Sequence, residues 1–210
     1  VIGLGAVLFA AAVGVILGLV AGFFGGVVDG IVMRIADVLV SFPTILVALL
    51  ISGIARAQLS ADTMLTWAPL VLIFSIAVNE WVQYARTVRA STMVEVARDY
   101  VRAAKVIGLP AGGIMGRHIL PNVMSSVMVI ATINLAGAIL TEATLSFLGA
   151  GMPPTYPSLG TLIRIGNQFL FSGLWWIAVM PAAVLVVLVL AVNVIGDYLR
   201  DRFNPKLMAR

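Results

Sequence analysis

The run VIGLGAVLFAAAVGVILGLVAGFF, residues 1–24, contains no charged side chain. A helix of about 20 apolar residues crosses the hydrocarbon core of a bilayer, which is roughly 30 Å thick. The run is long enough for this, and it lacks the alternation of polar and apolar residues that a barrel strand shows. Because the lipid interior accepts only helices and closed barrels, residues 1–24 are predicted to form a transmembrane helix.

Four further uncharged stretches have the same character. They are residues 38–55, residues 63–79 with an extension to Tyr84, residues 119–141, and residues 165–196. The last run is too long for one span, so its first part is predicted to be a loop and the span to cover about 174–196. Val1 opens inside a span without a preceding Met, and we expect an upstream segment with one more helix. The fold class is therefore an all-α polytopic transmembrane bundle with five visible spans and six in the intact protein.

The composition excludes several classes of protein. The chain of 210 residues is 61% hydrophobic and only 10% charged, whereas a soluble domain carries about 25% charged residues. This excludes a soluble enzyme domain, a disordered chain and a coiled coil. Cysteine is absent and His118 is the single histidine, so no cysteine nucleophile, thiolate metal site or His-rich metal site is available. We expect no catalytic residue, metal or cofactor in this chain.

The basic residues divide unevenly between the two sides of the membrane. Arg56 and Arg164 fall on one side, and the other eleven fall on the opposite side, which also holds the C-terminus. Cytoplasmic loops of membrane proteins carry the excess of Lys and Arg. The C-terminus of this multi-pass membrane protein is therefore predicted to be cytoplasmic.

The longest connection on the basic side covers residues 86–118. Residues 90–107 are predicted to form one amphipathic helix, with a stripe of small apolar residues at 3,4 spacing; its members are Val94, Ala97, Val101, Ala104 and Gly108. One interpretation is a helix that lies on lipid headgroups. The small side chains favour the other, which is docking in a groove of a partner protein.

A known signature appears in the same connection. DYVRAAKVIGLPAGGIMGRHILPN, residues 99–122, resembles the EAA signature of ABC importer permeases, with Ala103, Gly108 and Pro121 in register. Arg102 stands where the signature has Glu, and His118 stands at a position that is usually Ile. The HILPN ending resembles the peptide-importer branch of the family.

Three other segments resemble that branch. They are MRIADVLVSFP at 33–43, EATLSFLGAGMPPTYPSLG at 142–160, and WW at 175–176 with NVIGDYLRDRFNPKL at 193–207. Together with the EAA-like segment they keep the order and spacing of the dipeptide, oligopeptide and nickel permeases. The resemblance implies that residues 1–210 are a single permease domain of the type I ABC importer fold, in a multi-pass protein of the bacterial cytoplasmic (inner) membrane.

The resemblance also implies a set of partners. These are a second, homologous permease subunit, two cytoplasmic ATPase subunits and an extracytoplasmic substrate-binding protein, with no nucleic acid. Gly108 and Gly113 have the glycine spacing of a P-loop, but Ile114 and Met115 occupy its Lys and Ser/Thr positions, so ATP and Mg must bind the ATPases. The resemblance places ATPase coupling on Val94, Ala97, Asp99, Val101, Arg102, Ala103, Ala104, Gly108, His118, Leu120 and Pro121.

The candidates for the substrate pathway are polar residues near the outer half: Asn134, Glu142 and Gln168. Ionisable groups near hydrocarbon are costly and face protein or water. Glu142 is predicted either to meet the amino terminus of a peptide or to accept hydrogen bonds from backbone amides of its own loop. His118 is a candidate pH sensor, with a capping or hydrogen-bonding role at the junction as the alternative.

Two glycine-rich features leave alternatives open. Gly14, Gly18, Gly22 and Gly26 repeat every four residues and allow close helix approach, either within the chain or at a subunit seam. The outer Gly/Pro loop, residues 149–173, is predicted to have a defined, non-helical shape.

The predicted function is therefore a permease subunit for dipeptides or oligopeptides. The alternatives are a permease of the same type for nickel, glutathione or another small solute and, from another class, an ion-gradient-driven transporter. A secondary transporter is expected to have inverted repeats, and none is evident in this sequence.

Overall fold

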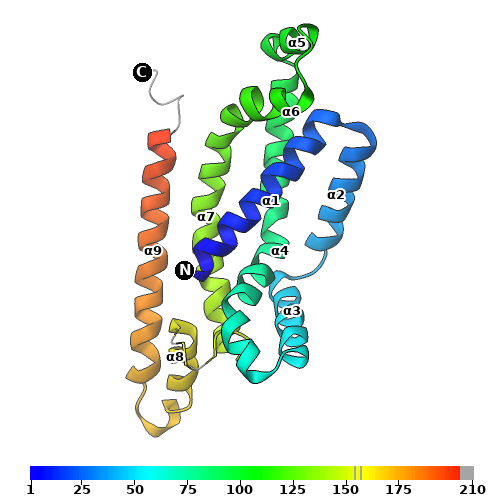
Figure 1. Ribbon diagram of the computed structural model, residues 1–210. Helices are drawn as coiled ribbons and strands as arrows, with labels where there is room; N and C mark the ends of the chain where they lie inside the picture. The colour runs from blue at the N-terminus through cyan, green and yellow to red at the C-terminus, as the bar shows by residue number, and fades with distance from the viewer. Residues whose placement is uncertain (154, 157, 204–210) are drawn as a thin grey trace.

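A computed structural model of the chain describes residues 1–153, 155–156 and 158–203. The described residues form helices joined by turns and loops, and they contain no strand (Figure 1). The helices are α1 (Ile2–Phe24), α2 (Gly26–Val40), α3 (Thr44–Gln58), α4 (Ala61–Val96), α5 (Asp99–Val106), α6 (Ala111–Ile114), a π-helical turn (Met115–Ile119), α7 (Leu120–Phe147), α8 (Leu159–Asn167), a 3-10 turn (Leu170–Ser172) and α9 (Trp176–Phe203).

Four helical segments in the described part are long and apolar enough to cross a membrane. They are Ile2–Phe24, Thr63–Val96, Ala111–Phe147 and Trp176–Tyr198, and the bent pair α2 and α3 counts as a fifth. Three predicted spans thus correspond to α1, α7 and α9, and the all-α polytopic fold class is confirmed. Two of the motif prolines, Pro154 and Pro157, and the tail 204–210 lie outside the described residues.

The predicted straight span over residues 38–55 is wrong. The helix ends at Val40, and α3 starts at Thr44 after a bend of 88°. Pro43 lies in this break, with φ −57° and ψ 127°. Proline lacks an N–H and disfavours helical geometry in the residue before it, so an uninterrupted apolar run does not make an uninterrupted helix here.

The predicted helix boundaries on either side of Tyr84 are also wrong. α4 does not end near Tyr84 but continues to Val96. Residues 90–107 are not one helix, because Ala97 and Arg98 separate α4 from α5, and Arg98 has an extended ψ of 148°. A helix keeps its backbone hydrogen bonds when it leaves the apolar layer, so hydropathy does not mark where α4 ends.

The core is built on the contact between α1 and α4. A Cβ atom on Gly14 would lie 2.5 Å from the carbonyl oxygen of Trp81, one on Gly18 would lie 2.6 Å from that of Ala85, and one on Gly22 would lie 2.7 Å from that of Arg89. The two backbones touch because these residues have no side chain. The glycine repeat thus serves packing within the chain at these three positions, whereas Gly26 has no atom within 4 Å.

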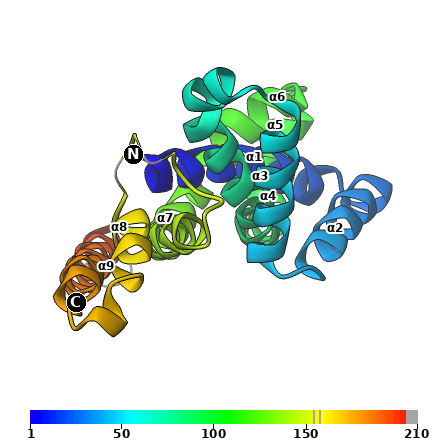
Figure 2. The same cartoon turned by 90° about the horizontal axis from the view of Figure 1, so that it is seen from below.

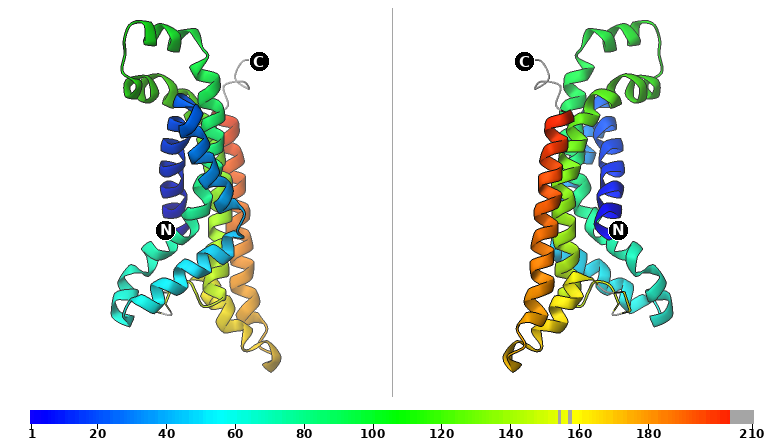
Figure 3. Two further views of the ribbon diagram at one scale, coloured as in Figure 1. Left: turned by 90° about the vertical axis from the view of Figure 1, so that its right-hand side faces the viewer. Right: turned by 90° about the vertical axis from the view of Figure 1, so that its left-hand side faces the viewer.

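The remaining spans are added to this pair. α7 packs on both α1 and α4, and α9 packs on α7 at the outer edge of the bundle (Figure 2). Only 6% of the most apolar window of α9 is buried, so most of that helix presents apolar side chains outward. Figure 3 shows α3 and the first half of α4 splaying away from the bundle at the end opposite α5.

The outer Gly/Pro loop is not wholly non-helical as predicted. Residues 149–173 contain α8 and the 3-10 turn. Ser158 caps α8 by accepting a hydrogen bond from the Thr161 N–H at 3.1 Å. A Cβ on Gly160 would lie 2.1 Å from the Ala143 carbonyl oxygen, so α8 rests directly on the backbone of α7.

Candidate functional site

The connection of residues 86–118, which carries the EAA-like segment, lies at one end of the bundle. α5 and α6 lie beyond the ends of the spans, at the same end as the last turn of α9, while α8 lies at the opposite end (Figures 1 and 3). The Arg56 guanidinium donates to the carbonyl oxygen of Gly151 in the outer loop. Arg56 and Arg164, on α3 and α8, thus lie at one end of the molecule, and the basic residues of the connection 98–117 lie at the other.

Gly108 ends α5 as predicted. Its φ is +85° and no atom lies within 4 Å of the place its Cβ would take. The Gly108 N–H donates to the Lys105 carbonyl at 3.1 Å, and the Leu109 N–H donates to the Ala104 carbonyl at 3.1 Å. This arrangement is a glycine C-cap, and Pro110 then begins α6 in an extended conformation. The direction in which the chain leaves α5 is thus set by backbone geometry.

Only two of the five members of the small apolar stripe face the inside of this chain. Val101 and Ala104 are buried in the core cluster that also holds Ile114 and Ile119. Val94 is 57% exposed on α4, and Ala97 is exposed in the break. Because α5 is turned onto its own bundle, the stripe is divided between two helices and does not form one outward face.

The outward face of this end consists of other residues. Val106, Ile107 and Leu109 are 88%, 77% and 42% exposed, and Arg102 and Ala103 are exposed beside them. A cluster of large exposed apolar side chains is typical of a contact with another protein or with the membrane. Sequence analysis missed these three because they lie off the stripe, although an apolar run just before Gly108 and Pro110 was a visible signal.

The remaining predicted residues of this region have mixed environments. Asp99 and Arg102 are exposed, and their charged groups lie 3.8 Å apart. Pro121 lies inside the continuous helical segment Ala111–Phe147, directly after the π-helical turn, and its missing N–H removes one backbone hydrogen bond there. Leu120 packs against the core cluster.

A polar cluster connects α5 to both neighbouring spans. The Tyr100 hydroxyl donates to the Glu95 carboxylate of α4 and accepts from the Asn122 side-chain amide of α7 at 3.1 Å. The Asn122 amide also donates to the His118 carbonyl at 2.8 Å. Partial burial, and then the hydrogen bond to Glu95, raise the pKa of the Tyr100 phenol. His118 thus accepts through its backbone at the junction, and its ring lies 6.4 Å from the Tyr100 ring.

Two ion pairs connect α2 to α4. The Arg89 guanidinium donates to both carboxylate oxygens of Asp29, and these side chains are 30% and 18% exposed. Arg86 contacts Asp37 at 2.8 Å, with side chains that are 47% and 57% exposed. α2 is therefore held to the core by two ion pairs in addition to the apolar contacts of Ala36, Val32, Met33 and Leu39.

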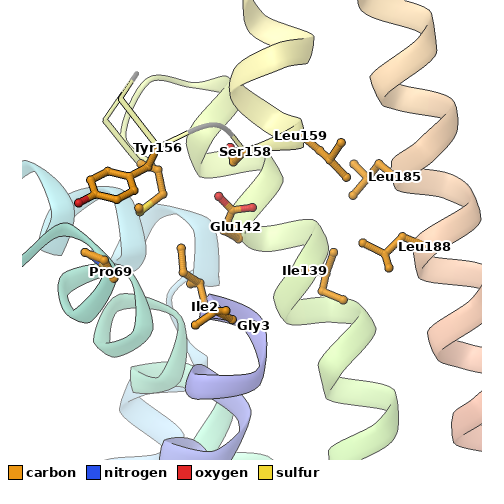
Figure 4. Close-up of a pocket in the computed structure, with 12 residues that line it drawn as sticks. Ile2, Gly3, Pro69, Ile139, Glu142, Tyr156, Ser158, Leu159, Leu185 and Leu188 are labelled. Carbon is orange, nitrogen blue, oxygen red and sulfur yellow. The ribbon is translucent and has the colours of Figure 1, made fainter. Parts of the chain in front are cut away.

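Glu142 lines a cavity near the opposite end (Figure 4). The cavity has a volume of about 570 Å³, and its lining is mainly apolar, from α1, α4, α7, the outer loop and α9. Glu142 accepts a hydrogen bond from the Ser146 hydroxyl at 2.7 Å, and that hydroxyl accepts from the Met152 N–H at 3.3 Å. The carboxylate therefore accepts from a hydroxyl on its own helix, which in turn holds the outer loop, and not directly from backbone amides of that loop as the second of its predicted roles has it.

The other two pathway candidates do not join Glu142. Asn134 is buried, and its amide nitrogen has no hydrogen-bond partner among the described residues. It lies eight residues before Glu142 on α7, which is about 12 Å along the helix. Gln168 is exposed after α8 and does not line the cavity. The three residues therefore do not form one site within this chain.

Comparisons with known proteins agree with the fold. Residues 14–208 match the family model described as binding-protein-dependent transport system inner membrane component. The chain is 37% identical over 201 residues to the dipeptide transport system permease protein DppC of Haemophilus influenzae, covering 96% of this chain and 64% of that protein. It is 34% identical over 206 residues to the oligopeptide transport system permease protein OppC of Bacillus subtilis, covering 98% of this chain and 64% of that protein.

A third relative and a solved structure extend this agreement. The glutathione transport system permease protein GsiD of Pectobacterium atrosepticum is 37% identical over 205 residues, which is 98% of this chain and 64% of that protein. The inward-facing MetNI methionine ABC transporter has a chain with a TM-score of 0.70 at 21% identity, covering 97% of this chain and 91% of the other. The chain spans less than two thirds of the length of these three relatives, and over that span it belongs to the family of binding-protein-dependent transport system inner membrane components, the permeases of ABC importers.

Proposed function

We propose that this chain is the membrane subunit of an ATP-driven importer of dipeptides or oligopeptides. It forms the translocation pathway together with a second permease, receives substrate from an extracytoplasmic binding protein and carries out no catalysis itself. The names of relatives at 34–38% identity over nearly the whole chain support the peptide class. ATP and Mg are bound by two ATPase subunits on the cytoplasmic side.

The observation that carries the proposal is the placement of α5. This helix stands beyond the spans at one end of the bundle (Figure 1), and it carries the EAA-like segment. Because the chain has no P-loop, the free energy of ATP hydrolysis has to enter by a protein contact. The exposed apolar tip formed by Val106, Ile107 and Leu109 is the surface on this end best suited to such a contact.

The distribution of charge orients the molecule. Six basic residues lie between Arg86 and Arg117, on the end that carries α5, and the end that carries α8 holds Arg56 and Arg164. The positive-inside rule therefore places α5 and the C-terminus in the cytoplasm. The splayed end with α8 then faces the binding protein.

A second candidate solute has a specific observation in its favour. The relative described as a glutathione permease is as similar to this chain as the dipeptide permease, at 37% identity. Glutathione is itself a modified tripeptide, so both solutes present an amino group, carboxylates and amides. Nickel remains an alternative within the family, and an ion gradient remains the alternative source of energy.

Transport by the reconstituted complex tests the proposal. The complex of both permeases, ATPases and binding protein is placed in vesicles and given labelled dipeptide, tripeptide, glutathione or nickel. We expect ATP-dependent uptake of a peptide against its gradient, and co-purification of the ATPases with this chain. Uptake that continues at full rate without the ATPases would contradict the proposal and favour the ion-gradient alternative. Uptake of nickel alone would contradict the peptide class.

Gly108→Trp tests the coupling role of α5. A side chain at φ +85° is strained by about 1–2 kcal/mol, and the break that positions α5 is expected to change. We expect ATP hydrolysis to continue in the assembled complex while peptide uptake falls at least tenfold. Gly112→Trp is the matched control, because Gly112 also has open space around it but no positive φ. Wild-type uptake by a normally assembled Gly108→Trp complex would contradict the coupling role.

A further inference from the structure

One side chain of α5, Tyr100, forms hydrogen bonds to both α4 and α7. Tyr100 is the second residue of α5, and its hydroxyl bonds to Glu95 in the last turn of α4 and to Asn122 in the first turn of α7. The backbone N–H of Arg98 also donates to the Glu95 carbonyl at 3.0 Å. Glu95 thus accepts one bond through its carboxylate and one through its carbonyl, and both bonds hold the turn between α4 and α5.

The chemistry of these groups determines the direction of each bond. An ionised carboxylate only accepts, so the Tyr100 O–H donates to Glu95. The phenol oxygen is then free to accept from the Asn122 amide, which also holds the His118 carbonyl at 2.8 Å. A hydrogen bond to an ionised group is about twice as strong as a neutral one. The Tyr100 hydroxyl can form both bonds because a phenol both donates and accepts a hydrogen bond, and its ring carries the hydroxyl far enough from the backbone to contact both spans.

Other contacts of α5 do not provide this double connection. Val101 and Ala104 are buried in a shared apolar cluster, which resists separation but does not fix an angle, because apolar contact is non-directional. Lys105 contacts the Phe23 ring of α1. Only the Tyr100 hydroxyl, among the described contacts of α5, has directional bonds to both α4 and α7.

We propose that Tyr100 is a positioning residue for energy coupling, whose hydroxyl makes α4 and α7 follow a displacement of α5. This inference rests on the proposed function. When an ATPase moves α5, the bond to Glu95 moves the end of α4 and the bond to Asn122 moves the start of α7. The two spans then shift as one unit. Without the hydroxyl, the apolar contacts of Val101 and Ala104 remain, but no directional bond fixes the angle between α5 and the two spans. Part of the displacement of α5 is then taken up by the turn at Ala97 and Arg98.

The ratio of peptide imported to ATP hydrolysed tests this inference in the reconstituted complex. Tyr100→Phe removes both bonds and keeps the ring, and we expect the ratio to fall about fivefold while assembly and ATP hydrolysis stay within about twofold of wild type. Glu95→Ala is expected to give a similar loss. Glu95→Gln keeps an acceptor for the phenol and is expected to restore the ratio to within about twofold of wild type. Tyr198→Phe, which removes a hydroxyl from an exposed position on α9, is the matched control.

A double variant provides a second test, because the effects of two substitutions that act through the same hydroxyl should not add. Asn122→Ala alone is expected to lower the ratio about threefold, and the double variant with Tyr100→Phe is expected to be no worse than Tyr100→Phe alone, because both act through one hydroxyl. A merely structural role would lower the stability of the complex and leave the ratio unchanged. A wild-type ratio in Tyr100→Phe and Glu95→Ala would overturn this inference, whereas a wild-type complex that imports no peptide would contradict the proposed function instead.

Discussion

The contact between α1 and α4 and the attachment of α5 represent opposite ways of holding helices together. Along α1, glycine lets backbone meet backbone, and Gly14, Gly18 and Gly22 leave no room for even a methyl group. α5 has two buried apolar residues, a few polar contacts and an exposed tip. Dense packing resists any change of geometry, while a small set of directional bonds permits a hinge movement. The pair α1 and α4 is therefore the more rigid part of the molecule, and the attachment of α5 is the part whose geometry changes more easily.

The largest effect is expected from filling the contact between α1 and α4. In Gly14→Leu the new Cβ would lie 2.5 Å from both the Trp81 carbonyl oxygen and the Tyr84 Cβ. The helices must separate, and the free energy of unfolding is expected to fall by about 3 kcal/mol. The unfolding midpoint of the purified protein in detergent measures the loss. Gly30→Leu on α2, with no atom within 4 Å, is expected to change it by about 0.5 kcal/mol or less.

The sequence predicts the rigid part of the molecule better than the movable part. α1 and α9 are found from apolar length alone, because a span has to cross a layer of given thickness. The glycine repeat was visible too, although only the structure shows that its partner is α4. Hydropathy predicts one span over residues 38–55, but it does not report the missing N–H of Pro43. The bend at Pro43 is therefore not predicted.

The candidate site shows the same limit. Its location within residues 86–118 was predicted from the resemblance to the EAA signature, and the end of α5 at Gly108 was predicted from glycine and proline. The break at Ala97 was not, because residues 90–107 have helical periodicity throughout and the break follows from packing of Val101 and Ala104 onto the bundle. The direction that α5 faces is a tertiary property, so the exposed tip could not be derived from spacing on one helix.

α2 is attached less densely than α1 and more firmly than α5, and substitutions in its two ion pairs test how much charge contributes to that attachment. Asp29→Asn removes the charge that meets the less exposed Arg89, and we expect a loss of about 1.5 kcal/mol in the free energy of unfolding. Asp37→Asn at the more exposed pair is expected to cost about 0.5 kcal/mol or less. Chemical or thermal unfolding in detergent at low and high salt distinguishes them, because salt screens the exposed pair more.

A charge swap completes this test. Exchanging Asp29 and Arg89 restores the pair but places Arg in the first turn of α2, where the helix dipole favours an acidic residue. The double variant is therefore expected to recover only part of the stability lost in Asp29→Asn. Equal losses for Asp29→Asn and Asp37→Asn would show that burial of the pair contributes nothing, and α2 would then belong with the loosely held elements.

The smallest effect is expected at the contact between Lys105 and Phe23, which lies where α1 meets α5. The ammonium group is 5.0 Å from the ring centroid, and a contact of this kind contributes about 0.5–1 kcal/mol at an exposed site. Lys105→Ala is expected to make hydrogen exchange of residues 99–106 about two- to threefold faster without changing exchange in α1 or α4. Lys105→Arg keeps a cation over the ring and is expected to exchange at the wild-type rate. Because a local opening involves only α5, a change that spread equally through α1 and α4 would mean that α5 unfolds together with the bundle, and the distinction between the more rigid pair and the attachment of α5 would fail.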